Sequence, residues 1–225
     1  MTFVCEFCKR FFARENTWYN HSCEKKRRWF NRDTAQGRMA FYSWQRFHEL
    51  SGMRNIKKVT QEDFISSAFY GAFNKFSTHV IENDVVAPRA FIDFVIRSNI
   101  PVDKWGQESL LVVYVRDLIA TETCDQALAR SVEYLAQWSQ QNNTPWRDFF
   151  RVVNTNMGTQ IICHGRISPW LIYNADSSME FLQRCSSEQV SMIQNWAPAH
   201  VWQLKLKNHP QDVEFAREML AQAGI

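Results

Sequence analysis

Two cysteines near the start of the chain, Cys5 and Cys8, are separated by two residues, and His21 follows after twelve more. At this spacing two thiolates can reach one metal ion while the backbone amides between them point toward the sulfurs, and imidazole is another ligand that Zn²⁺ favours. Aromatic residues accompany these ligands at Phe3, Phe12 and Trp18. A domain of this size has almost no core, so the metal supplies much of its folding energy. The pattern predicts a structural Zn²⁺ site.

The fourth ligand of this site has three candidates. Cys23 is the nearest, because positions 25 to 27, where a ligand usually follows, are Lys-Lys-Arg. Residues two apart on a regular helix point about 200° away from each other, so coordination by both His21 and Cys23 requires the helix to end or distort there. The alternatives are a water molecule or a cysteine from the rest of the chain. We favour Cys23, and four protein ligands leave no open position for a substrate or an activated water.

The run from Phe3 to His21 resembles the ββα zinc finger at every ligand and hydrophobic position, with Trp18 where leucine is usual. The resemblance implies two short strands and a helix whose first turns face the major groove of DNA. It ends at the fourth ligand, since no histidine or cysteine stands three to five residues after His21.

Basic residues concentrate around this finger. Residues 1–46 contain ten Lys or Arg against four acids, a balance of +6, whereas the remainder has sixteen against nineteen, a balance of −3. A basic head on a mildly acidic body is typical of a chain that binds a polyanion with one end. The predicted nucleic-acid-binding residues are Lys9, Arg10, Arg14, Asn16, Tyr19, Lys25, Lys26, Arg27, Arg28, Trp29 and Arg32.

Interleaved basic and aromatic side chains suit phosphate contact together with base stacking, which favours single-stranded or forked DNA. One finger contacts only about three base pairs, so we expect weak sequence selectivity. Two alternatives stay open. The basic run can be a solvated helix face, or the finger can dock a protein, with Trp29 and Phe30 packing it onto the body.

The remainder of the chain predicts an all-α, multi-helix body of eight to ten short helices. Capping signals stand at Thr60 with Asp63, at Thr123 and at Ser186 with Gln189, and prolines open helices at Pro88 and Pro145. Apolar spacing predicts one helix from Thr60 through Phe64 and Phe69 to Val80, another over 107–120, and a last one over 211–221 that ends at Gly224. We expect two domains, a zinc finger with its basic extension over 1–30 and an all-helical domain over 37–225.

No catalytic residue is predicted. His79, Cys163, His164 and His209 are the side chains with suitable chemistry, but Cys163 and His164 are adjacent and diverge, and no phosphate loop or nucleophile elbow is present. Apolar runs such as 110–115 are too short to span a bilayer, and Cys5, Glu6, Cys8 and Lys9 interrupt any signal-peptide core. We expect a cytoplasmic protein with no membrane contact and no small-molecule substrate.

The finger and helical body resemble the uncharacterised zinc-finger proteins of T-even-type marine tailed phages, over most of the chain. The residues that carry this resemblance are 3–9, 21–29 and 165–174. It implies the host cytoplasm as the setting and a role in phage DNA metabolism, with no established reaction.

A second resemblance, to the T-even-type phage DNA helicase loader, rests on residues 94–105, 111–119 and 162–173. That family is small, all-helical and basic, binds forked DNA and hands the replicative helicase onto it. The loader pattern has no zinc finger at its head, so this chain departs from it where DNA contact begins. We therefore expect a non-enzymatic DNA-binding accessory protein of phage replication or transcription that binds a protein partner through its helical body, with helicase loading as the most specific form. The alternative is a structural or adaptor protein whose finger docks a protein.

Overall fold

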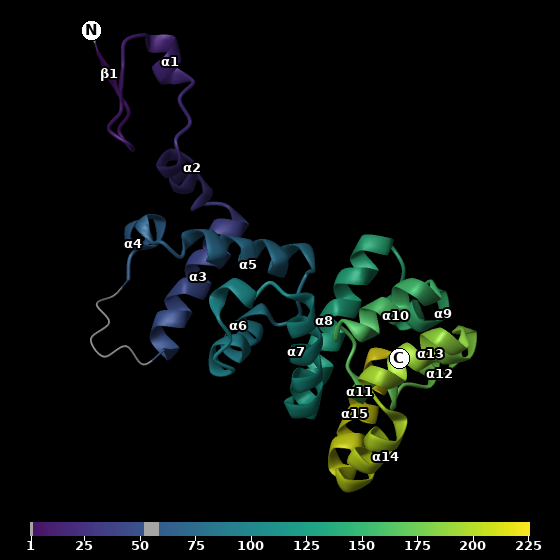
Figure 1. Ribbon diagram of the computed structural model, residues 1–225. Coiled ribbons are helices and arrows are strands. Elements are labelled where there is room, and N and C mark those ends of the chain that lie inside the picture. The colour runs from purple at the N-terminus through teal and green to yellow at the C-terminus, as the bar shows by residue number, and fades with distance from the viewer. Residues whose placement is uncertain (1, 52–58) are drawn as a thin grey trace. The chain divides into compact units, whose positions relative to one another are not determined.

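The computed structural model describes residues 2–51 and 59–225 of the chain (Figure 1). Over these residues the chain forms fifteen α-helices, two short 3-10 helices and one two-stranded sheet. It divides into two compact units, unit 1 (Met1–Leu111) and unit 2 (Val112–Ile225). The predicted domains, 1–30 and 37–225, stay predictions. No helix in the described ranges is long and apolar enough to cross a membrane.

Unit 1 begins with two short strands and one short helix. The strands β1 (Phe3–Val4) and β2 (Phe11–Phe12) are antiparallel, and Phe3 pairs with Phe12. Helix α1 (Glu15–Tyr19) follows and packs against both strands. We call residues 2–23 the finger. It is joined to the rest of unit 1 by helix α2 (Glu24–Asn31) (Figure 1).

The rest of unit 1 is a helical layer built around Trp105, which is fully buried. Helix α3 packs against α5 and α6, and the rings of Phe47, Phe73 and Phe76 lie 5.2 to 5.9 Å from that of Trp105. The Trp105 indole N–H donates to the carbonyl of Ile100 (2.8 Å), so its polar atom is satisfied inside the core. The elements are α3 (Ala35–Leu50), α4 (Gln61–Ser66), α5 (Tyr70–Glu82), α6 (Pro88–Arg97) and η1 (Val102–Lys104).

The single helix predicted from Thr60 to Val80 is wrong, because two helices, α4 and α5, occupy that span. Ser67 is extended, and its hydroxyl oxygen accepts the backbone N–H of Phe69 (3.0 Å), a local bond that competes with the helical ladder. The break turns Phe69 outward, where it is 56% exposed, although the helical pattern predicts it to be inward. The predicted capping box of Thr60 and Asp63 is confirmed.

The junction between α2 and α3 is a close approach of two backbones. A Cβ atom at Gly37 would lie 1.9 Å from the carbonyl oxygen of Asn31 and 3.0 Å from the Cα of Arg32. The side chain of Asn31 reaches the other way and donates to Asn74 Oδ1 (2.7 Å) on α5. Only glycine therefore lets α2 sit at this place against the helical layer.

Replacement of Gly37 by alanine should destabilise unit 1 by about 1–3 kcal/mol, because backbone atoms rather than a flexible side chain must move. The matched control is Gly71→Ala in the first turn of α5, where no described atom lies within 4 Å of the new Cβ. The control should stabilise the helix by about 0.4–1 kcal/mol. Urea unfolding of both variants measures the difference. Equal stabilities for the two would contradict the close approach.

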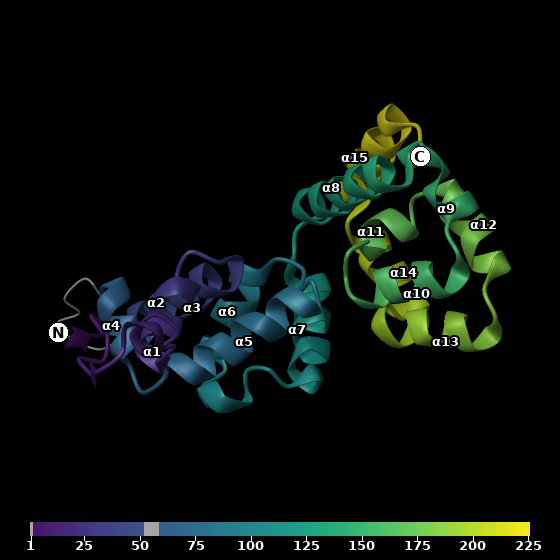
Figure 2. The same cartoon turned by 90° about the horizontal axis from the view of Figure 1, so that it is seen from above.

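Unit 2 contains the C-terminal part of α7 and the eight α-helices that follow it, α8 to α15. Helix α10 packs on α13, α12 on α9, and α11 on both α8 and α15 (Figure 2). Its core contains Trp138 against Phe149 (4.9 Å between ring centres) and Trp170 against Trp202 (5.7 Å). The elements are α7 (Glu108–Thr121), α8 (Cys124–Asn142), η2 (Trp146–Asp148), α9 (Phe149–Val152), α10 (Thr155–Cys163), α11 (Pro169–Ile172), α12 (Asp176–Arg184), α13 (Ser187–Trp196), α14 (Ala199–Asn208) and α15 (Pro210–Ala223).

The predicted all-helical body is confirmed, but the number of helices was underestimated. Thirteen helices, α3 to α15, stand in the described part of the body rather than eight to ten, because several are single turns such as α9 and α11. The helix over 107–120, the cap at Thr123, the capping box at Ser186 and the end of the last helix at Gly224 are confirmed. Pro145 differs, since a 3-10 turn rather than an α-helix follows it.

Candidate metal centre and the basic segment beside it

The side chains of Cys5, Cys8, His21 and Cys23 come together in unit 1. Their ligand atoms all lie within 4.8 Å of one another. The Sγ atoms of Cys5 and Cys23 are 3.9 Å apart, and Cys8 Sγ is 3.2 Å from His21 Nε2. Three sulfurs and one imidazole nitrogen grouped in this way can hold a metal ion.

The chain brings Cys23 to the cluster by ending the finger helix early. Helix α1 stops at Tyr19, so neither His21 nor Cys23 is helical. Cys23 is extended (φ −85°, ψ 162°) and caps the next helix, where its Sγ accepts the N–H of Lys26 (3.4 Å). Because His21 and Cys23 are two residues apart, both can face one metal ion only if the helix ends or distorts near His21. Helix α1 ends two residues before His21, so this requirement is met.

Aromatic contacts hold the strands and α1 around the four ligands. The rings of Phe3 and Trp18 stack at 5.8 Å, and the Trp18 indole N–H donates to the carbonyl of Val4 (3.0 Å). The ring of Phe12 lies 4.6 Å from that of His21 and fixes the orientation of the imidazole. Each aromatic position of the sequence pattern therefore supports the cluster.

The turn between Cys5 and Cys8 directs backbone groups at the cluster. The backbone N–H of Cys8 points at the Cys5 sulfur and is the main reason that the pKa of this thiol is lowered. The turn closes with hydrogen bonds from Lys9 N–H to the Cys5 carbonyl (2.9 Å) and from Cys5 N–H to the Arg10 carbonyl (3.0 Å). At Cys5 a lowered pKa favours the thiolate, which is the form that ligates metals. The backbone N–H of Arg10 also lowers the pKa of Cys8, but burial and the neighbouring Cys5 and Cys23 raise it overall.

The three cysteines of unit 2 lie outside this cluster. Burial raises the pKa of Cys124 and of Cys163 to about 11, and burial also raises that of Cys185. These three are thiols at neutral pH. Cys124 and Cys163 are buried and behave as small apolar side chains, whereas Cys185 is partly exposed.

Arg28 has a structural role in unit 1. One of its guanidinium nitrogens, Nη1, donates to the carbonyls of Ile65 (2.9 Å) and Ser67 (3.4 Å), which are left free where α4 ends. The guanidinium also lies 4.5 Å from the ring centre of Tyr70, and its Nη2 atom forms an ion pair with the carboxylate of Glu24. Arg28 therefore holds α2 against α4 and α5.

Trp29 and Arg32 also make contacts inside unit 1. The Arg32 guanidinium lies 3.7 Å from the ring centre of Trp29, whose ring is 6.1 Å from that of Phe7 in the finger. Phe30 reaches Phe7 from the same helix (6.1 Å). These contacts pack α2 against the finger. The other predicted nucleic-acid-binding residues are exposed, with Lys26 half-buried: Lys9, Arg10, Arg14, Asn16, Tyr19, Lys25 and Arg27.

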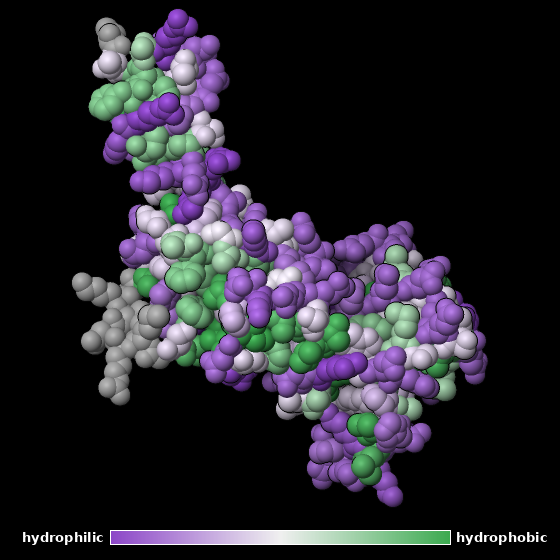
Figure 3. Space-filling model, viewed as in Figure 1, coloured by the Kyte–Doolittle hydropathy of each residue, from purple (hydrophilic) through white to green (hydrophobic). Residues whose placement is uncertain are grey.

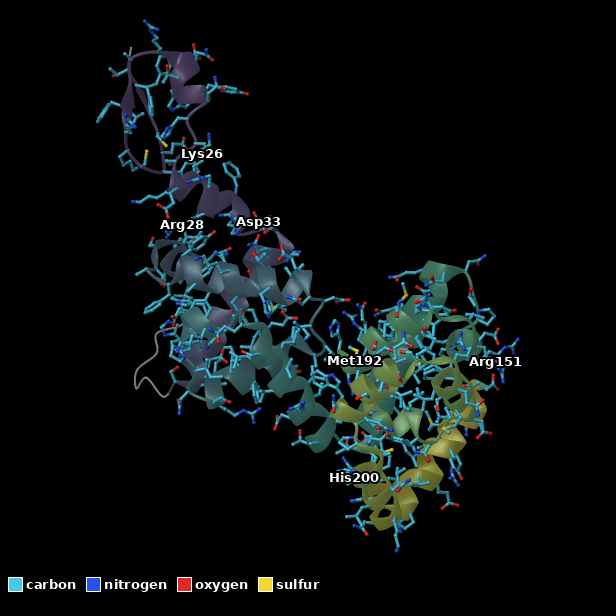
Figure 4. The ribbon with its side chains drawn as sticks, turned by 45° about the vertical axis from the view of Figure 1, so that its right-hand side comes forward. Lys26, Arg28, Asp33, Arg151, Met192 and His200 are labelled. Atoms are coloured by element: carbon cyan, nitrogen blue, oxygen red, sulfur yellow. The ribbon has the colours of Figure 1, made fainter. Side chains whose placement is uncertain are left out.

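A pocket of about 630 Å³ lies between the finger and helix α2. Its rim carries two exposed aromatic side chains, Tyr19 (75% exposed) and Phe30 (62%), together with Trp18 and Phe7. Lys26 lines it as well, and its ammonium donates to the carbonyl of His21 (3.3 Å). Figure 4 shows Lys26 at the finger end of α2 and Arg28 beside the helical layer.

No protein-family model matches the chain, and neither a curated protein nor a solved structure matches it.

The pocket was not predicted from the sequence, and Phe30 and Glu6, which line it, are absent from the predicted site. The sequence does indicate that Lys26 and Phe30 are neighbours, because they are four residues apart and so share one face of α2. The contribution of Tyr19 and Trp18 from the preceding helix had no such signal, since it depends on how α1 and α2 pack.

Substitution of Cys23 should separate its role as a metal ligand from its role as the N-cap of α2. Cys23→Ser keeps an N-cap oxygen for α2 but removes a sulfur ligand, whereas Cys23→Ala removes both. Loss of a residue that only hydrogen-bonds a metal ligand lowers metal affinity by about 10–100-fold. We expect both Cys23 variants to lose more affinity than this, because the ligand itself is removed. Only the alanine variant should also lose about 0.5–2 kcal/mol of stability in α2. Co²⁺ titration measures the first effect and amide hydrogen exchange in α2 the second, with Ser22→Ala as the control. Metal binding by Cys23→Ser at wild-type affinity would assign the fourth ligand elsewhere.

Proposed function

We propose that the finger is a ββα-like zinc finger and that its Zn²⁺ is structural. Zinc bonds to sulfur are about 2.3 Å long, so tetrahedral geometry sets two sulfurs about 3.8 Å apart. The Cys5–Cys23 separation of 3.9 Å fits this value. Three thiolates and an imidazole are a common zinc donor set. With four protein ligands, the ion would have no open position for a substrate and would act by holding the two strands, α1 and the start of α2 together.

We propose that this finger and α2 bind single-stranded or forked DNA. The observation that carries the proposal is the pocket whose rim combines Tyr19 and Phe30 with Lys26. Exposed aromatic rings stack on unpaired bases, and neighbouring cations contact the phosphates, a combination found in proteins that bind single strands. Figure 3 shows hydrophobic and hydrophilic side chains side by side over this part of the molecule. Lys9, Arg10, Arg14, Lys25 and Arg27 supply the exposed positive charge.

The proposed role is that of a non-enzymatic accessory protein in phage DNA replication or transcription, in the host cytoplasm. Helicase loading is its most specific form, and the helical body would bind the protein partner.

Fluorescence anisotropy with labelled single-stranded, duplex and forked DNA at two salt concentrations tests the proposal. The full zinc-loaded chain is compared with Lys25→Ala/Arg27→Ala, which leaves Arg28 in place because Arg28 holds α2. Loss of two phosphate contacts should reduce the slope of log affinity against log salt by about 1.4 on a single strand. The control is Lys75→Ala/Lys104→Ala, which removes two exposed cations elsewhere in unit 1.

A second pair of variants tests the aromatic pocket. Tyr19→Ala and Phe30→Ala should each weaken single-strand binding by about 1–3 kcal/mol, the value of one base stacked on an aromatic ring. Phe69→Ala, which removes an exposed ring outside the pocket, should leave binding unchanged. If the wild-type chain binds none of the three DNA forms, the finger is a protein-docking module, and partner capture that is insensitive to salt would support that alternative.

A further inference from the structure

Unit 2 contains a groove of about 750 Å³ between the C-terminal half of α7 and helix α14. Ile119, Trp196 and Trp202 contribute to its apolar lining. Val201 and Leu204, three residues apart on α14, also line it and are 49% and 60% exposed. A contiguous apolar groove that stays open to solvent indicates a site of interaction.

Positive side chains border this groove. The Arg116 guanidinium lies 5.4 Å from the ring centre of Trp196, and Lys205 Nζ lies 4.6 Å from that of Trp202. Lys205 also donates to the carbonyl of Ala120 (3.2 Å), which ties α14 to α7. No carboxylate lines the groove among the residues that the structure describes. At one end of the groove the carboxylate of Asp212 lies 3.5 Å from His209 Nδ1, and both Glu122 and Asp212 act electrostatically on Lys205.

Helix α15 exposes a face of the opposite character. Phe215 and Met219, four residues apart, are 40% and 42% exposed. Glu214 and Glu218 are exposed and each precedes one of them, so their carboxylates follow one edge of this apolar pair. Arg217 lies about 100° further round, on the far side of Glu218 from Met219. The face is an apolar pair with an acidic border, and the groove is an apolar surface with a basic border.

We propose that α15 of a second copy of this chain docks in the groove. Phe215 and Met219 cover Val201 and Leu204, and the two glutamates approach Arg116 and Lys205. This is the helix-in-groove mode, in which residues about one turn apart anchor an amphipathic helix. The groove and α15 are different parts of the surface, so the contact is heterologous. One helix buries less than the about 1,200 Å² of a stable interface, so the association is weak and depends on concentration.

Other occupants fit less well. A nucleic-acid strand would place its phosphates over the apolar Val201 and Leu204. A small ligand would leave the open side of the groove uncovered, whereas ligand sites enclose most of their ligand. The second copy supplies both apolar and charge complementarity from residues of the same chain.

Sedimentation velocity of the full zinc-loaded chain over a wide concentration range tests this proposal. The wild type should shift reversibly to larger species as the concentration rises. Leu204→Glu and Arg116→Glu should each weaken the association at least about tenfold, which corresponds to about 1.4 kcal/mol. The double variant Arg116→Glu/Glu218→Arg should regain it, because each contact between two copies then pairs a glutamate at position 116 with an arginine at position 218, while Lys205 and Glu214 are unchanged. Met179→Glu and Arg147→Glu are matched exposed controls in unit 2 that should associate like the wild type.

Three results would overturn the proposal. The first is a wild type that remains a monomer at every concentration. The second is association that Leu204→Glu leaves unchanged, which would place the contact on another face. The third is a double variant no better than Arg116→Glu alone. Circular dichroism of each variant shows that its helices are retained, and the test does not depend on DNA binding.

Discussion

Removal of the metal, or replacement of Cys5 by serine, should unfold residues 2–23 while α3 to α15 remain folded. The finger has two strands of two residues each and one five-residue helix with no buried residue. Such short elements are not stable in water without further contacts. Structural zinc binds finger peptides with an apparent free energy of about 10–16 kcal/mol, and this binding energy is the folding energy of the domain. The finger should therefore lose all measurable stability.

Amide hydrogen exchange before and after chelation measures this effect. The finger amides should exchange at the rate of an unfolded chain, whereas those of the Trp105 core should stay protected. Cys185→Ser removes a thiol outside the cluster and should leave the finger protected. Protection of the finger amides in the chelated protein would contradict a structural metal. Single-strand binding should fall together with finger protection, since Tyr19 and Trp18 belong to the finger.

Replacement of Glu122 by glutamine should destabilise unit 2 by about 3–5 kcal/mol, because it leaves a buried guanidinium without its counter-charge. Glu122 is 8% exposed, and its carboxylate accepts two bonds from Arg130 Nη2 (2.5 and 2.6 Å) and one from the Ser168 hydroxyl (3.1 Å). Arg130 also donates to the carbonyl of Gly165. This network joins the end of α7 to α8 and to the segment before α11.

Chemical denaturation of the variant measures the loss, with exposed Glu133→Gln as the control. A double variant, Glu122→Leu/Arg130→Met, should recover most of the stability, since an apolar pair of similar size removes both charges at once. If Glu122→Gln lowers the free energy of unfolding by less than about 1 kcal/mol, the Glu122–Arg130 ion pair behaves like a solvent-exposed one.

Much of the helical architecture follows from local signals. The capping boxes at Thr60 and Ser186 and the helix cap at Thr123 lie where the sequence predicts them, because each uses side chains and backbone groups only a few residues apart. The helix break at Ser67 was missed, since the same apolar spacing continues through it. The hydroxyl of a serine in such a stretch can compete with the helix, but periodicity alone does not show when it will.

The candidate metal centre is the part of the site that the sequence determined by itself. The four ligands lie within nineteen consecutive positions, so a short chain with a turn at Cys5–Cys8 and a helix that ends before His21 brings them together. The ring contacts Phe3–Trp18 and Phe12–His21 lie within the same short segment.

The role of each basic and aromatic side chain depends on its contacts in the folded chain. Arg28 follows Arg27 in the sequence, yet one docks α2 on carbonyls nearly forty residues away and the other is exposed. The pocket of Tyr19 and Phe30 and the groove of Arg116 and Leu204 join residues from different helices. A charged or aromatic side chain has the same helix propensity and spacing whether it packs inside the unit or is exposed to solvent. Its role depends on packing between distant segments, which side-chain spacing along the chain does not specify.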